Sequence, residues 1–319
     1  MREIRPNLAR QYIDAVSVFE ACEDAEREAL LVRGGMYWHK GPASAPEAVY
    51  LVRTSPKGAE KSLGPRTPET ERTYARFLER KQLAQDRLAA LTEKRKEHER
   101  MNRALRVGRV DPIVVKVLDR MASSGLTEFF RVVGTHALYA YEAAAGVVVD
   151  DDAVATHDID LLWDVRKRLH FATALARVDS SMLGVLKKVD KTFRLKDLDK
   201  YTAVNQDGFE VDILRREQQG EDPHPIRMSD DEDDFWVTQA RQAHVLMDAP
   251  PFSAVIVASN GTMARMNTLH PMAFARFKRW MSGQQDRDPL KRRRDALQAE
   301  VVEAMVKEYL PQWQASAST

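Results

Sequence analysis

From Asp111 onward, short apolar runs alternate with helix-compatible segments, and this alternation limits the possible folds more than any other feature of the chain. Short apolar runs bounded by turn residues indicate buried strands, and they occur at residues 129–133 and 159–163. The pattern also predicts helices over residues 113–121, 135–145 and 179–189. Strands mixed with helices in this order are typical of an α/β or α+β domain, and this is the fold class that we expect.

Two hairpins are expected to extend this domain. Asp207-Gly208 separates the strand-like residues 201–205 and 209–214, and Asn260-Gly261 separates residues 254–258 and 263–269. Asp-Gly and Asn-Gly pairs favour hairpin turns because both residues tolerate positive φ angles. The strands of each pair are therefore predicted to be antiparallel neighbours.

The two flanks differ from this central part. The N-terminal flank contains two predicted strands, at residues 34–39 and 49–53, and a long helix that begins at Thr67-Pro68 and runs to about Leu105. This helix is locally basic, which a solvated charged face explains. Two further helices are predicted at residues 272–281 and 289–309. We expect an accessory module over 1–109, a core over 110–270 and a C-terminal helical subdomain over 271–319.

The composition excludes several classes of protein. The net charge of +1 excludes a globally basic nucleic-acid coat but is compatible with a basic patch. Because Cys22 is the single cysteine, an internal disulfide and a cysteine zinc site are both excluded. The start of the chain is charged where a signal peptide needs apolar residues, and the longest uncharged stretch, 249–264, is interrupted by prolines. We expect a cytoplasmic protein without a membrane partner.

Three aspartates are the candidate metal ligands. Asp158 and Asp160 project from the same face of their predicted strand, because successive side chains of a strand alternate. Asp212 shares a strand face with Glu210, on a separate strand. Carboxylates near one point repel one another unless a cation lies between them. Mg²⁺ or Mn²⁺, which prefer oxygen ligands, would satisfy such a set.

Gly134-Thr135 is the candidate phosphate-binding element, because it lies between a predicted strand and a predicted helix. Glycine allows a phosphate to approach the backbone, and a helix N-terminus offers free N–H groups. A Gly-Thr pair or an Asp-x-Asp alone is weak evidence. The ordered set of strand, Gly-Thr, helix, Asp-Ile-Asp strand and hairpin Asp is much rarer, and it indicates a functional site.

These motifs resemble a known superfamily. The stretches 132–138, 156–162 and 210–214 are similar to the nucleotidyltransferases of the DNA polymerase β type, and most of all to the bacterial minimal and abortive-infection toxin types. The resemblance covers roughly residues 111–299. It implies a mixed sheet in which Asp158 and Asp160 bind two metal ions, and Asp212 holds the ion that activates the acceptor. It also implies that Gly134 and Thr135 cradle the β- and γ-phosphates of an NTP.

The resemblance extends to the C-terminal helices. The toxin-type enzymes carry a helical lysine followed by a basic-Asp pair, and Lys278 and Arg294-Asp295 are similar to these. By this likeness Lys278 and Arg294 would bind the nucleotide, and Asp295 would lie near the acceptor or orient a base. The alternative is a structural role, in which Lys278 extends to solvent and Asp295 pairs with Lys291 one helical turn earlier.

The resemblance implies an enzyme that moves an NMP from an NTP to an acceptor hydroxyl and releases pyrophosphate. RNA or tRNA is the favoured acceptor, with a role as a toxin, and a protein or small-molecule acceptor remains open. The basic cluster Arg287 and 291–294 either contacts RNA phosphates or forms a solvated face. Two alternatives remain: a catalytically silent RNA- or protein-binding module, and a regulatory protein. An antitoxin or a second copy of the chain is a further candidate partner.

Overall fold

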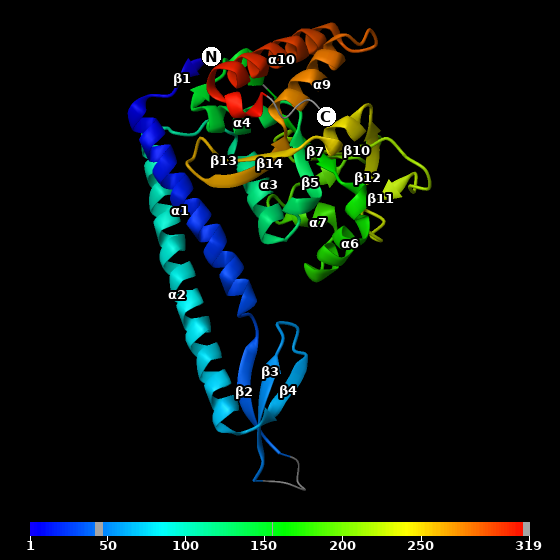
Figure 1. Cartoon of the computed structure of the whole chain (residues 1–319). Coiled ribbons are helices and arrows are strands. Elements are labelled where there is room, and N and C mark those ends of the chain that lie inside the picture. The colour runs from blue at the N-terminus through cyan, green and yellow to red at the C-terminus, as the bar shows by residue number, and fades with distance from the viewer. Residues whose placement is uncertain (42–46, 155, 315–319) are drawn as a thin grey trace. The chain divides into compact units, whose positions relative to one another are not determined.

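The computed structural model describes residues 1–41, 47–154 and 156–314 (Figure 1). Residues 42–46, 155 and 315–319, which belong to the three predicted segments, lie outside the described residues. The chain forms two compact units, residues 11–101 and residues 1–10 together with 102–319. The segment boundaries predicted at 109/110 and 270/271 stay predictions.

The unit of residues 11–101 is a helical hairpin with a small sheet. The helices α1 (Pro6–Leu31) and α2 (Pro68–Leu105) run antiparallel, since Gln11 bonds to His98 and Glu28 pairs with Arg87. Between the helices, three strands form an antiparallel sheet: β2 (Gly35–Lys40), β3 (Val49–Thr54) and β4 (Glu60–Pro65). The sheet packs on α2 through Trp38, whose ring lies 5.6 Å from that of Tyr74.

The second unit is built on a mixed sheet, as expected for the α/β class. Its strands follow the order β11-β12-β10-β7-β5-β14-β13 (Figure 1). Strand β10 is parallel to β7 and β12, and β5 is antiparallel to β7. The strands are β5 (Phe130–Val133), β7 (Asp158–Trp163), β8 (Arg194–Leu195), β9 (Thr202–Val204), β10 (Glu210–Arg216), β11 (Ile226–Arg227), β12 (Trp236–Ala240), β13 (Pro251–Val257) and β14 (Met263–Leu269). A separate pair joins β1 (Arg2–Glu3) to β6 (Val147–Val148).

Both predicted hairpins are present, and β9 occupies only part of the edge of β10. Strand β9 pairs with Glu210–Asp212, whereas β12 pairs with the later residues Leu214–Arg216. Gly208 and Gly261 have φ angles of 79° and 90°, as the turns require. The short strand β9 therefore borders the part of β10 that carries Asp212.

The helices of this unit begin at well-defined caps. Asp111, His270 and Asp288 each accept a hydrogen bond from the first turn of the helix that follows, and a proline comes next. The helices are α3 (Pro112–Ser123), α4 (Ala137–Ala145), α5 (Asp151–Val154), α6 (Arg168–Arg177), α7 (Met182–Lys187), α8 (Ala243–Asp248), α9 (Pro271–Ser282) and α10 (Pro289–Tyr309). None of the helices in the described ranges is long and apolar enough to cross a membrane.

The helix predicted over 179–189 is shorter in the structure because it has a strong start signal at Ser181. The Ser181 hydroxyl accepts the N–H of Gly184, and the buried Asp234 accepts the N–H groups of Met182 and Leu183. The last residue of the acidic run 230–234 is therefore a structural cap, while the residues before it are exposed.

The C-terminal helices share one hydrophobic core with the sheet. Phe274 of α9 and Val302 of α10 belong to the same buried cluster as Val132 and Ile159 of the central strands. The phenol of Tyr141 donates to the Leu269 carbonyl across this core. The packing holds α9 and α10 against the sheet, close to the strands that carry the aspartates.

Candidate active site

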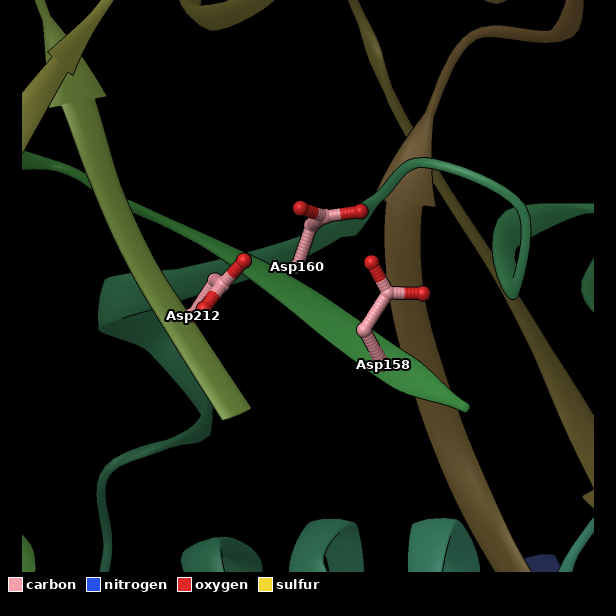
Figure 2. Close-up of side chains that lie close together, drawn as sticks. All are labelled: Asp158, Asp160 and Asp212. Atoms are coloured by element: carbon pink, nitrogen blue, oxygen red, sulfur yellow. The ribbon is translucent and has the colours of Figure 1, made fainter. Parts of the chain in front are cut away.

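The three aspartates predicted from strand alternation lie together. Strands β7 and β10 are parallel, and their register pairs Asp160 with Asp212 and Asp158 with Glu210. Each of Asp158, Asp160 and Asp212 offers a carboxylate oxygen within 4.8 Å of the others. Figure 2 shows the three carboxylates on one side of the two strands. The sheet register thus forms a compact acidic cluster.

The electrostatics of this cluster fit a divalent cation. Burial, followed by the charges of Asp158 and Asp212, raises the pKa of Asp160 to about 7, against the influence of Lys278 and Arg287. The pKa of Asp212 is also raised, mainly by burial. The carboxylates therefore repel one another in the absence of a cation, and an oxygen-only donor set of this kind suits Mg²⁺ or Mn²⁺.

A fourth carboxylate on the same face already has a partner. Glu210 forms an ion pair with Lys196 at 2.6 Å. This pairing balances the charge of Glu210 with the adjacent charge of Lys196.

Gly134 lies directly against the acidic cluster. It follows Val133, which pairs with Asp160 across β5 and β7, and it has a φ of 70°. A Cβ atom at this position would overlap the Asp160 carboxylate. A larger residue is therefore excluded by both the backbone conformation and the close approach.

Thr135 is buried and bonded to the C-terminal helix. Its side-chain oxygen accepts a hydrogen bond of 3.1 Å from Gln298 of α10, whose amide also donates to the Ala153 carbonyl at 2.6 Å. The Ala153 carbonyl can only accept, so it fixes the amide nitrogen of Gln298 toward both partners. Sequence reasoning did not identify Gln298, because nothing in the helix pattern distinguishes it.

Lys278 belongs to a buried charge cluster rather than to the solvent-exposed surface. Its ammonium lies 2.8 Å from the carboxylate of Asp295, which is fully buried and also pairs with Arg287 at 2.5 Å. The alternative pairing of Asp295 with Lys291 is therefore wrong. Arg294 is partly buried and does not line the pocket described next, whereas Arg287, in the loop before α10, does line it.

A pocket of about 390 Å³ opens beside the acidic cluster. Its lining includes Gly134, Asp160, Lys278 and Arg287, and so combines both signs of charge. The other polar lining residues are Arg241, Gln284 and Asp286, and the apolar ones, from the sheet and from α8 and α9, are Val133, Leu162, Leu214, Ala240, Ala243, Leu246, Phe277, Trp280 and Met281. Such a pocket suits a ligand that combines charged and apolar groups.

Comparison with known proteins agrees with this geometry. No curated protein and no solved structure matches the chain. A family model described as nucleotidyltransferase matches residues 113–319, which include the acidic cluster, the Gly134 turn and both C-terminal helices. This match covers more than half of the chain, and the chain therefore belongs to the nucleotidyltransferase family.

Proposed function

We propose that the protein transfers a nucleoside monophosphate from an NTP to an acceptor hydroxyl, with pyrophosphate as the leaving group. The observation that carries the proposal is the acidic cluster of Asp158, Asp160 and Asp212, of which Asp160 lines a pocket of about 390 Å³. In this reaction the acceptor oxygen bonds to the α-phosphorus, and the bond from that phosphorus to the β-phosphate oxygen breaks. The hydroxyl proton passes to water.

The aspartates fit the role of ligands for two divalent cations. Such ions, when bound, would neutralise charge on the phosphates and lower the pKa of the acceptor hydroxyl. Asp158 and Asp160 would contact both ions and Asp212 the one on the acceptor side. Without cations, three carboxylates would repel a triphosphate, so we expect nucleotide binding to depend on the metal.

The cations of the protein itself are placed to bind the polyphosphate. Lys278 and Arg287 both line the pocket, and both are held by the Asp295 carboxylate. A buried carboxylate shared by two cations fixes their positions before the ligand arrives, so little reorganisation is needed when the polyphosphate binds. The absence of a Cβ at Gly134 lets the Asp160 carboxylate lie directly against the turn. The apolar wall would then contact the nucleobase.

RNA is the acceptor that we propose. The first two turns of α10 carry the exposed residues Lys291 and Arg293 and the partly buried Arg292, adjacent in sequence to the pocket residue Arg287. A row of cations of this kind suits a phosphate backbone. The roles as a toxin and as the partner of an antitoxin stay predictions.

Calorimetric titration of each NTP with Mg²⁺ or Mn²⁺ tests the proposal, alongside transfer from NTPs labelled on the α-phosphate to total RNA. We expect metal-dependent NTP binding and labelled RNA from the wild-type protein. The double variant Asp158→Asn/Asp160→Asn should lose both. Asp233→Asn, which changes an exposed loop carboxylate, should retain both. A wild-type protein that binds no NTP in the presence of metal would overturn the proposal.

A further inference from the structure

The two outer carboxylates of the acidic cluster each accept a hydrogen bond from a threonine. Thr202 of β9 donates from its hydroxyl to Oδ1 of Asp212 at 2.5 Å, and Thr156 donates to Oδ1 of Asp158. Thr202 is 3% exposed and pairs directly with Asp212 in the β9–β10 register. The carboxylate of the central Asp160 abuts Gly134 instead.

These two hydroxyls act against the repulsion within the cluster. Three carboxylates with oxygens within 4.8 Å of one another would lower their energy by rotating apart. A hydroxyl bonded to one oxygen of a carboxylate resists that rotation, because a hydrogen bond to a charged group is stronger than one between neutral groups.

We propose that Thr156 and Thr202 are positioning residues, which hold Asp158 and Asp212 in the metal-binding arrangement before any cation is present. Each threonine bonds to Oδ1 of its carboxylate and leaves the other oxygen available to a cation. The central Asp160 retains both oxygens for the cations. This inference rests on the proposed function, since it assigns the hydroxyls a role in metal binding.

Thr202→Val tests the inference most directly, because valine has nearly the same shape as threonine and suits a strand but cannot donate. The measurement is the affinity of the metal-free protein for Mn²⁺ by electron paramagnetic resonance, without nucleotide. Loss of a group that orients a metal ligand typically weakens affinity about 10- to 100-fold. We expect the Mn²⁺ affinity of Thr202→Val to be lower by about 10-fold or more. The Mn²⁺ affinity of Thr156→Val should also be lower than that of the wild type. Thr202→Ser, which restores the hydroxyl, should remain within about threefold of the wild type.

Thr192→Val is the matched control. The Thr192 hydroxyl also donates to a carboxylate, that of Asp190 at 2.7 Å, but outside the acidic cluster. Its loss should lower the thermal midpoint without changing the Mn²⁺ affinity. If Thr202→Val binds Mn²⁺ as tightly as the wild type, the positioning role is wrong and the metal site stands. If the wild type itself binds no Mn²⁺, the metal site and the positioning role both fail.

Discussion

Lys278→Met removes one cation from the buried charge cluster, and the structure sets the size of the effect. Lys278 is 5% exposed and Asp295 is fully buried, so the substitution leaves a buried carboxylate with Arg287 as its remaining partner. Burial lowers the pKa of Lys278, and the Asp295 charge opposes that shift. Breaking a buried ion pair costs about 3–5 kcal/mol, and the remaining Arg287 favours the lower end, about 3 kcal/mol.

The assay for this prediction is urea unfolding with a thermal scan. A loss of about 3 kcal/mol corresponds to a midpoint lowered by roughly 6–12 °C for a domain of this size. Lys307→Met, on the exposed face of α10, is the control and should change stability by less than about 0.5 kcal/mol. The double variant Lys278→Met/Asp295→Leu should regain much of the loss, because apolar residues replace a buried pair at little cost. If the free energy of unfolding of Lys278→Met lies within about 1 kcal/mol of the wild-type value, the ion pair with Asp295 contributes little to stability. Strictly additive effects in the double variant would show that Lys278 and Asp295 are not coupled.

Three further predictions concern the site and its surroundings. Gly134→Ala should lower Mn²⁺ affinity at least about 10-fold in calorimetry, because a Cβ displaces the Asp160 carboxylate, and unchanged affinity would contradict the close approach. In the presence of a chelator the stability of the folded state should fall as pH rises from about 4 to 7, because the raised pKa of Asp160 lets the folded state keep a proton that the unfolded chain releases. Urea unfolding at pH 5 and pH 7.5 checks this, and Asp160→Asn should reduce the difference; an identical pH dependence in both proteins would count against it. Replacing Arg292 and Arg293 with Gln should weaken RNA binding and flatten its salt dependence in a filter-binding assay, with NTP affinity unchanged. If the salt dependence of RNA binding is unaltered, Arg292 and Arg293 belong to a solvated face that does not contact RNA.

Strand alternation predicted that Asp158 and Asp160 share one strand face, and the resemblance implied that Asp212 joins them. Asp158 and Asp160 project from one face of β7, and the parallel register with β10 brings Asp212 beside Asp160. The hairpin turn also placed β9 next to β10 correctly. The alternation predicts the strand faces correctly because Ile159 and Val211, which neighbour the aspartates in sequence, are fully buried on the opposite face.

The threonine partner of Asp212 was not predicted, and the turn gives the physical reason. A two-residue turn at Asp207-Gly208 would place residue 203 opposite Asp212. Instead, the side chain of Asn205 accepts the N–H groups of Asp207 and Phe209, which widens the loop and shifts the register by one residue. Thr202 therefore lies opposite Asp212. An asparagine at position 205 whose side chain accepts N–H groups of the turn predicts the longer loop, and with it the pairing of Thr202 with Asp212.

The arginines of the pocket were also missed. The resemblance assigned Arg294 a role beside Lys278, whereas Arg241 and Arg287 are the arginines that line the pocket. Arg287 lies in the loop between α9 and α10, where residue spacing predicts no direction for a side chain. Strand β4 was not predicted either, because its Glu-Lys-Ser-Leu-Gly-Pro sequence lacks apolar alternation and depends on pairing with β3.

Asp212→Asn tests whether the three aspartates perform the transfer. This nearly isosteric change removes one charge, so the fold should persist and the metal-free protein should lose one source of repulsion. NTP binding should persist in part, since Asp158 and Asp160 remain. Single-turnover transfer of a labelled NMP to RNA, with an unfolding curve for each protein, should show a decrease of at least about 100-fold in rate. A folded Asp212→Asn variant that transfers at a near-normal rate would show that Asp212 takes no part in the transfer.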